Sequence, residues 1–199
     1  MTNEARVPAI EITGPMGAVM KFAARKMLGE VPDSLGVMWN NPKVLMDMMG
    51  VNRKAEKWHE LDKNLGVLAN MAAAASVGCS FCLDLNYFMS RSHGLDETKA
   101  RGVPGWRESV VYTPLERHVM EYAEAMCQTP VAVTDELAAT LLDRLGAPAL
   151  LELTAHIAIM NMSARANIAL GIRSQGLAAS CGMPPLATGA TTADVGSTA

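Results

Sequence analysis

The amino-acid sequence predicts an all-α protein, because its composition, its helix boundaries and its lack of strand patterning agree. Half of the 199 residues are hydrophobic but only 5% are aromatic, and alanine, leucine and methionine dominate the apolar set. These side chains lose little rotamer freedom in a helix. No stretch alternates apolar and polar residues over a length that would predict a β-strand. We therefore expect one domain, built as a bundle of seven or eight helices.

Proline, glycine and N-cap residues divide the chain into these helices. The clearest start is Thr113-Pro114-Leu115-Glu116, a capping box with proline in the first turn. A loop rich in glycine and proline covers 101–112. The first predicted helix starts at Thr13-Gly14-Pro15 and ends before Pro32. The next segment starts at Asn41-Pro42 and runs to about 64 as one bent helix or two. The remaining predicted helices cover 62–76, 79–92, 113–127, 135–146 and 148–170.

The domain organisation follows from the ends of this pattern. We expect a single helical domain over residues 1–181, in which residues 1–30 form an N-terminal extension. From residue 182 onward the chain is small, polar and nearly uncharged. Such a composition buries too little apolar surface to fold, so 182–199 is predicted to be a disordered tail.

Charge and hydropathy exclude several classes of partner. The net charge is −3 and the signs are mixed, which gives no electrostatic basis for binding nucleic acid or a membrane surface. Residues 64–83 carry no charge, but asparagine, glycine, serine and cysteine make them too polar for a membrane span. The N-terminus has no apolar core of a secretory signal. We expect a cytoplasmic protein, where a close cysteine pair is more often catalytic or metal-binding than structural.

The segment SVGCSFCLDLN places Cys79 and Cys82 three residues apart, directly after Gly78. In the first turn of a helix the two thiols share one face and could form a disulfide. Unpaired backbone N–H groups and the helix dipole stabilise a thiolate there, which lowers its pKa. The sequence therefore indicates a redox-active pair.

Two other interpretations of the pair stay open. A structural zinc site needs four ligands, and the remaining cysteine and histidine residues form no second pair at ligand spacing. Two buried, inert thiols are the other alternative, since cysteine is among the most buried residue types. No βαβ pattern surrounds the motif, so the host is not a thioredoxin fold. We expect no metal and no cofactor.

The segments GCSFCLDLN and ARANIALGIRSQG, in this order, resemble the carboxymuconolactone decarboxylase / alkylhydroperoxidase D-like (AhpD-like) family, and the resemblance extends over most of 35–177. The resemblance implies an AhpD-like all-α bundle that forms homo-oligomers, often trimers or hexamers. It also implies that peroxidase members reduce hydroperoxides through the dithiol. A partner that carries lipoyl or thioredoxin-like groups then restores the thiols.

The same resemblance assigns roles to single positions. Cys82 matches the thiol that attacks peroxide, and Cys79 matches the resolving thiol. A histidine four residues after the second cysteine and a glutamate upstream assist deprotonation in such peroxidases. In this sequence the histidine position holds Asn86, and the glutamate position falls on or near Val67. Phe81 lies between the cysteines. Asparagine and valine cannot take a proton, and losing a general base costs on the order of 10²–10⁴ in rate.

Another titratable group could replace the missing base. The candidates are Asp84, His59, Glu60 and His156. Each also has a simpler interpretation: Asp84 as an acid in the first turn of its helix, His59 and Glu60 as solvated residues, and His156 as a hydrogen-bonded core residue.

The sequence thus favours an alkylhydroperoxidase-like dithiol oxidoreductase that acts on a peroxide or a disulfide. One alternative is a lactone decarboxylase-like enzyme of the same family whose cysteines are structural. The other is a non-catalytic oligomeric binding protein that has the fold without the proton relay.

Overall fold

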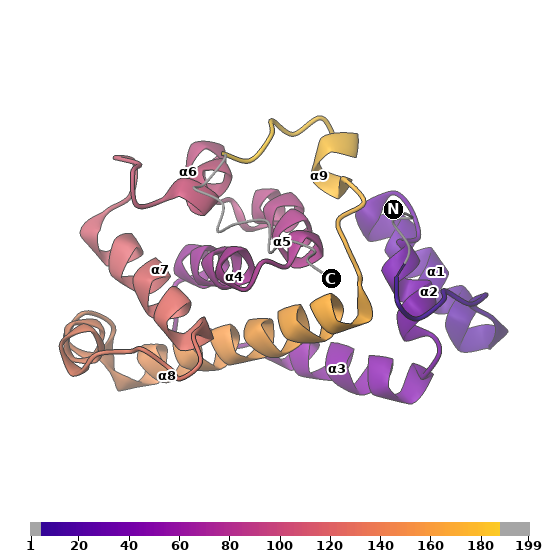
Figure 1. The fold of residues 1–199 in the computed structure, drawn as a ribbon, viewed down its shortest axis with the longest axis horizontal. Helices are drawn as coiled ribbons and strands as arrows, with labels where there is room; N and C mark the ends of the chain where they lie inside the picture. Colours follow the sequence, from indigo (N-terminus) through magenta and orange to yellow (C-terminus); the bar gives the residue numbers. More distant parts are fainter. Residues whose placement is uncertain (1–4, 188–199) are drawn as a thin grey trace, which may run out of the picture.

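A computed structural model describes residues 5–187, and this part of the chain consists of helices and loops without strands (Figure 1). The result confirms the predicted all-α fold. The elements in chain order are α1 (Gly14–Leu28), α2 (Asp33–Met38), α3 (Pro42–Ala55), α4 (Lys63–Val77), α5 (Ser80–His93), α6 (Glu97–Gly102), the 3-10 helix η1 (Val103–Gly105), α7 (Pro114–Cys127), α8 (Asp135–Leu170) and α9 (Leu177–Ser180).

Helix α4 lies at the centre of the bundle and contacts α5, α7, α8 and η1 (Figure 1). It begins at Asp62, whose carboxylate accepts hydrogen bonds from the backbone of the first turn. Half of its buried residues are alanine, and Leu68 and Met71 are also fully covered. Alanine favours the helix and lets neighbouring backbones approach closely. The Ala-rich sequence therefore makes α4 the helix around which the others pack.

The main hydrophobic core, which we call the core cluster, fills the space between α4, α7 and α8. Its largest fully buried side chains are Leu68, Met71, Tyr87, Val103, Val119, Met120, Leu141, Leu153 and Ile157. The core cluster includes residues from the start of α4 to the end of the described chain, so it ties distant segments together.

Helix α8 has a kink where the sequence predicts one helix to end and another to begin. Gly146 has φ 77° and ψ 163°, and Pro148 follows in the next turn. By length and composition α8 is the one helix among residues 5–187 that could cross a membrane. It is interrupted at Gly146, however, and it packs on α4 and α7 as a core helix.

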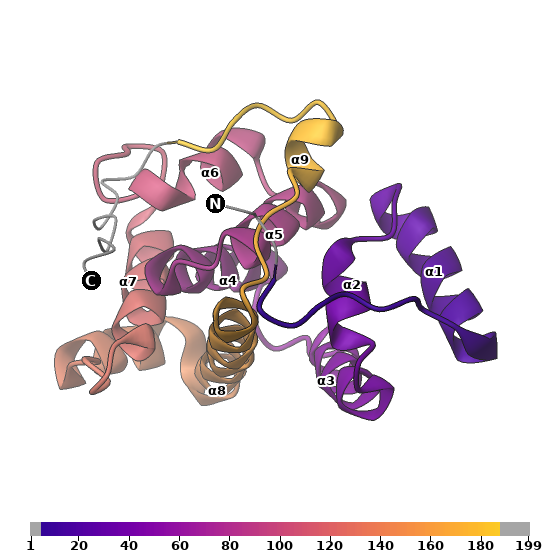
Figure 2. The same ribbon diagram turned by 45° about the vertical axis from the view of Figure 1, so that its right-hand side comes forward.

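The N-terminal helices α1, α2 and α3 form a second, smaller apolar cluster beside the bundle (Figure 2). Hydrogen bonds of Arg6 and Asp33 connect this part of the chain with the end of α8 and the segment after it. Arg6 donates to the carbonyls of Ile168 and Ala169, each at 2.8 Å. Asp33 and Gln175 exchange two hydrogen bonds, both of 2.8 Å. The extension is therefore anchored near the C-terminal end of α8.

The first residues of the predicted tail, 182–187, contact the domain. Met183 is buried in the core cluster, and the Tyr87 hydroxyl donates to the carbonyl of Pro184 at 2.9 Å. The backbone N–H of Ala187 donates to the carbonyl of Arg101 at 2.9 Å. Residues 182–187 are thus packed against the domain, because Met183 supplies an apolar anchor within an otherwise polar segment. The rest of the predicted tail, 188–199, lies outside the described residues.

The start of α7 has the capping box that the sequence indicates. The Thr113 hydroxyl accepts from the Glu116 N–H at 3.2 Å, and the Glu116 carboxylate accepts from the Thr113 N–H at 2.8 Å. Lys99 donates to the same carboxylate at 2.7 Å. These contacts hold the pKa of Glu116 below its ordinary value although burial opposes this.

The predicted loop 101–112 contains the end of α6 and the 3-10 helix η1, and the rest of it has no regular secondary structure.

Replacing Leu153 by alanine tests the importance of the α8 contact with the core. Leu153 is fully buried, so the change leaves a cavity and should lower the free energy of unfolding by about 2–5 kcal/mol. Leu151→Ala is the matched control, since Leu151 is 71% exposed and its loss should change stability by less than about 0.5 kcal/mol. Urea unfolding of both variants measures the difference. Equal losses at the two positions would contradict this packing.

Candidate active site

The junction of α4 and α5 presents the two cysteines at a helix N-terminus. Gly78 ends α4 with φ 82° and ψ 24°, a left-handed conformation that glycine adopts without strain. Its N–H donates to the carbonyls of Ala74 and Ala75, and the chain then turns into α5. Cys79 is the N-cap residue of α5, and Cys82 lies in its first turn. The glycine stop thus sets the position of both thiols.

The two sulfurs face each other inside the protein. Cys79 Sγ and Cys82 Sγ are 2.6 Å apart, and both cysteines are free thiols. The backbone N–H of Cys82 also points at Cys79 Sγ, at 3.2 Å. A disulfide bond is about 2.05 Å long, so little movement would close one. The geometry brings together the pair that the sequence singles out.

Hydrogen bonding makes the two thiols unequal. The pKa of Cys79 falls to about 7, chiefly because Cys82 donates to its sulfur, and burial opposes this only in part. The pKa of Cys82 rises well above its ordinary value, because it is the donor to Cys79 and because it is buried. The hydrogen bond between the two sulfurs thus favours one thiolate and one thiol in the pair. The lowered pKa favours Cys79 as the thiolate, whereas the resemblance implies that Cys82 is the attacking thiol.

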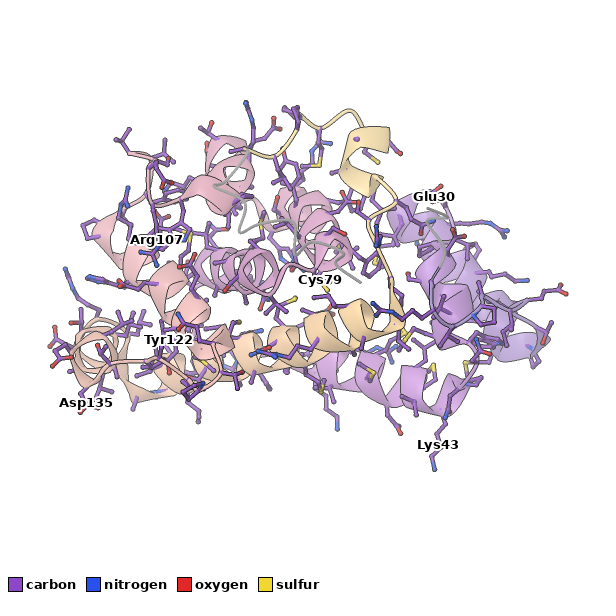
Figure 3. The ribbon with its side chains drawn as sticks, in the orientation of Figure 1. Glu30, Lys43, Cys79, Arg107, Tyr122 and Asp135 are labelled. Atoms are coloured by element: carbon purple, nitrogen blue, oxygen red, sulfur yellow. The ribbon has the colours of Figure 1, made fainter. Side chains whose placement is uncertain are left out.

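The wall around the sulfurs is apolar, with two amide side chains. Ala74, Ala164 and the two cysteines form a small buried cluster between α4, α5 and α8, with Phe81 and Met160 packed against it. Figure 3 shows Cys79 in this place, beside the second half of α8. The exposed fractions of Cys79 and Cys82 are 1% and 4%. Substrate access therefore needs side chains of this wall to move.

The two amides contact Cys82 in different ways. Asn167, in the last turn of α8, donates from Nδ2 to Cys82 Sγ at 3.3 Å. Asn86 donates from Nδ2 to the Cys82 carbonyl at 2.8 Å and lies 3.9 Å from the sulfur of Met160. Asn86 thus occupies the predicted histidine position but holds the backbone of α5. The predicted glutamate position, Val67, packs against the core cluster.

Asp84 has a structural role in this arrangement. One carboxylate oxygen accepts from the Ser174 hydroxyl at 2.6 Å and from the Leu177 N–H at 2.8 Å. The other accepts from the Ala178 N–H at 3.0 Å. All three donors belong to α9 and the segment before it, so Asp84 fastens this segment to α5. Nothing in these contacts directs Asp84 to the thiols.

The remaining candidate bases lie in a different part of the molecule. His156 packs edge-on against Trp58 with ring centroids 5.2 Å apart, and its Nε2 is 3.8 Å from a Glu152 oxygen. Burial lowers the pKa of His156 despite this carboxylate. Glu152 also accepts from the Glu60 N–H at 2.8 Å, which ties the segment before α4 to α8. His59 and the Glu60 side chain are exposed, whereas the thiols are buried.

The other two cysteines differ from the pair. Cys127 is buried, and burial raises its pKa to about 11, which makes it a poor nucleophile at neutral pH. Cys181 is exposed. Within residues 5–187, no group of three or more histidine, cysteine, aspartate or glutamate residues is placed to hold a metal ion.

Sequence reasoning identifies both cysteines and misses the role of Asn167. The residue belongs to the ARANIALG segment that carries the family resemblance, so a signal is present in the sequence. The segment does not reveal which of its side chains meets a sulfur. That follows only from the packing of the end of α8 on the start of α5.

Comparisons with known proteins agree with this fold and this motif. Residues 43–125 match the carboxymuconolactone decarboxylase family (CMD). The uncharacterized protein YnjA of Escherichia coli K12 is 38% identical over 117 residues, which are 59% of this chain. The alignment with YnjA spans only 64% of the length of YnjA. The uncharacterized protein YdfG of Bacillus subtilis 168 is 26% identical over 133 residues, which are 66% of this chain and 88% of YdfG.

Solved structures show the same fold at low sequence identity. A cysteine-to-alanine variant of the debrominase Bmp8, in complex with 2,3,4-tribromopyrrole, has a TM-score of 0.76 at 18% identity and covers 88% of this chain and 95% of its own. An uncharacterized peroxidase-related protein with an alkylhydroperoxidase AhpD core, from Ralstonia eutropha JMP134, has a TM-score of 0.75 at 16% identity. It covers 87% of this chain and 94% of its own.

The matched segment holds α4, the glycine turn, the cysteine pair, α5 and most of α7, whereas α8, which covers the thiols with Ala164 and Asn167, lies outside it. The solved structures match across the bundle as a whole. Within an AhpD-like all-α fold, residues 43–125 of this chain therefore match the carboxymuconolactone decarboxylase family.

Proposed function

We propose that this protein is a dithiol oxidoreductase that reduces hydroperoxides through Cys79 and Cys82. The observation that carries the proposal is the facing pair of free thiols at the start of α5, with the pKa of Cys79 lowered to about 7. A thiolate attacks peroxides, and a thiol beside it can close the disulfide. The match of residues 43–125 to the carboxymuconolactone decarboxylase family and the AhpD-core neighbour support an activity of this class.

The first step is attack by Cys79. Its thiolate takes the terminal oxygen of the hydroperoxide ROOH, so an S–O bond forms, the O–O bond breaks and an alkoxide RO⁻ leaves. The sulfur of Cys79 is thereby oxidised to a sulfenic acid, because the transferred oxygen keeps its hydrogen. Cys82 is protonated and close enough to supply the proton that the alkoxide needs. The thiol pair itself thereby provides the acid that a histidine would otherwise supply.

The second step closes the disulfide. The deprotonated sulfur of Cys82 attacks the sulfenic sulfur of Cys79, the S–S bond forms and the S–O bond breaks. The hydroxide that leaves takes up a proton from the solvent, which replaces the proton that Cys79 released when it ionised. The sum is a dithiol and ROOH converted to a disulfide, ROH and water. Two electrons must then come from a reductant. We propose a thioredoxin-like or lipoyl-bearing protein in this role, because thiol–disulfide exchange with either restores both thiols.

A second candidate function is reductive dehalogenation. The debrominase Bmp8 shares the fold, and the sulfurs here are surrounded by apolar groups and amides, with no carboxylate or imidazole bonded to either sulfur among residues 5–187. Such a wall suits a halogenated aromatic ring. The reaction would convert an aryl bromide and two thiols to the debrominated ring, a disulfide and hydrogen bromide. Bromide release from 2,3,4-tribromopyrrole measures this activity.

We also propose that the chain works as a homo-oligomer, such as a trimer or hexamer. Support comes from apolar side chains that the single chain leaves exposed on α1, namely Met16, Val19, Phe22 and Met27. An exposed apolar stripe of this kind is typical of a contact with another protein surface.

The pH dependence of the thiols follows from their unequal pKa values. A lowered pKa means that the Cys79 thiolate forms as the pH rises through about 7, while Cys82 stays protonated. We expect the thiolate absorbance of the reduced protein to rise by one thiolate around this pH and to vanish from this range in Cys79→Ser. Cys127→Ser is the control and should leave the step unchanged. A step that persists in Cys79→Ser and is lost in Cys82→Ser would reverse the two roles.

Single-cysteine variants test the two-step reaction. With excess hydroperoxide, the reduced wild-type protein should lose two hydrogens and become resistant to thiol alkylation at Cys79 and Cys82. Cys82→Ser should stop at the sulfenic acid, which a dimedone adduct on Cys79 reveals, and Cys79→Ser should lose at least about 10²-fold in rate. Cys181→Ser serves as a control with full activity. If neither peroxide nor tribromopyrrole oxidises the pair, the protein is the non-catalytic or thiol-independent family member.

Oligomer formation is tested by mass in solution. Phe22 is 69% exposed on α1, so the double variant Val19→Ser, Phe22→Ser should lower the molar mass measured by light scattering toward that of a single chain. Val110→Ser is a matched control, because Val110 is 94% exposed in a loop rather than on this helix. A wild-type protein that is monomeric at all concentrations would exclude the oligomer.

A further inference from the structure

Asn167 reaches the thiol pair from the far end of α8. We propose that Asn167 is a catalytic residue that stabilises the negative charge on the Cys82 sulfur after Cys82 has given up its proton. The inference rests on the proposed dithiol reaction and deepens it. The observation behind it is the hydrogen bond from Asn167 Nδ2 to Cys82 Sγ, 3.3 Å long, across 85 residues of sequence.

The position of Asn167 is fixed by the end of its helix. The Asn167 carbonyl accepts from the N–H of Ile172 at 2.9 Å, which closes the last turn of α8. The next two carbonyls, of Ile168 and Ala169, accept from the Arg6 guanidinium at 2.8 Å each. A cation at a helix C-terminus stabilises that turn. The amide is therefore held against the sulfur by contacts independent of the thiols.

The chemistry of the site calls for a donor at this point. The hydrogen bond with Cys79 and burial raise the pKa of Cys82, so its anion is costly to form, and the hydrogen bond from Asn167 acts in the opposite direction. Among residues 5–187, Asn167 is the only side chain outside the cysteine pair that donates a hydrogen bond to the sulfur of Cys82. An amide N–H donates at every pH and takes no proton. Asn167 can thus stabilise the thiolate without acting as a base.

This role belongs to the second step of the reaction. Once the alkoxide has removed the proton of Cys82, the sulfur carries a full negative charge until it attacks the sulfenic sulfur of Cys79. A fixed donor aimed at the place where charge develops lowers the barrier to forming it. The missing histidine and glutamate are then compensated in two ways, by the proton of Cys82 and by the amide of Asn167.

The test separates the two steps. After one equivalent of hydroperoxide, at a pH well above the first thiol pKa so that Cys79 is ionised in both proteins, Asn167→Ala should form the sulfenic acid on Cys79 at a rate close to wild type. It should convert this to the disulfide about tenfold more slowly, because a hydrogen bond to an anion corresponds to about one unit of pKa. Dimedone should trap more sulfenic acid in this variant. Asn167→Asp, which replaces the N–H donor by a carboxylate, should be slower still, and Asn167→Ser, which retains a hydroxyl donor, should be intermediate.

The control is Asn161→Ala. Asn161 lies on the same helix and bonds to the Met126 carbonyl and to Arg165, but not to a sulfur. It should leave disulfide closure unchanged. A similar loss in Asn161→Ala, or an unchanged closure rate in folded Asn167→Ala and Asn167→Asp, would overturn the proposal.

A second readout needs no turnover. Thiolate absorbance of the reduced protein should show the first thiol pKa raised by about one unit in Asn167→Ala, since the amide also lowers the pKa of Cys79. An unchanged titration would reject the role of Asn167 even if the wild type proves inactive toward peroxide. Failure of the wild type to form the disulfide would instead reject the proposed function.

Discussion

The burial of the Ala-rich helix α4 is the constraint on which the rest of this structure depends. Its small side chains let α5, α7 and α8 pack closely around it, so the three surrounding helices are positioned relative to one another through α4. Interiors are close-packed, and this leaves few alternative arrangements. The helix also ends at Gly78, and that end determines where α5 begins. Core packing and site geometry therefore have a common origin.

The candidate site needs few features beyond this arrangement of helices. A glycine stop, an N-cap cysteine and a second thiol one turn later are local features. Helix α8 covers these thiols with Ala164, Met160 and Asn167. The apolar cover strengthens the hydrogen bond between the two sulfurs, since a low local dielectric strengthens such contacts. The polar contacts of the thiols come from the sulfurs themselves and from amides, where the resemblance implies histidine and glutamate.

Much of the fold could be predicted from the sequence. The capping box at Thr113, the break at Gly78 and the stop at Gly146 each rest on backbone rules that act within a few residues, and all are present. The packed segment around Met183 could not be predicted, because one buried side chain reverses the expectation from a polar composition. Likewise, Asp84 looks like a first-turn acid in the sequence, yet its partners lie about 90 residues away, at Ser174.

What the sequence by itself determined is therefore the helical class, the helix boundaries and the spacing of Cys79 and Cys82. These depend on intrinsic propensities, caps and periodicity, which are local properties of the chain. Only the tertiary structure decided which thiol has the lowered pKa and which distant side chain meets it. Asn86 was expected at the site and instead holds the backbone, whereas Asn167 reaches the sulfur. The reason is that such contacts are created by the packing of one helix on another, and no local rule of the sequence encodes them.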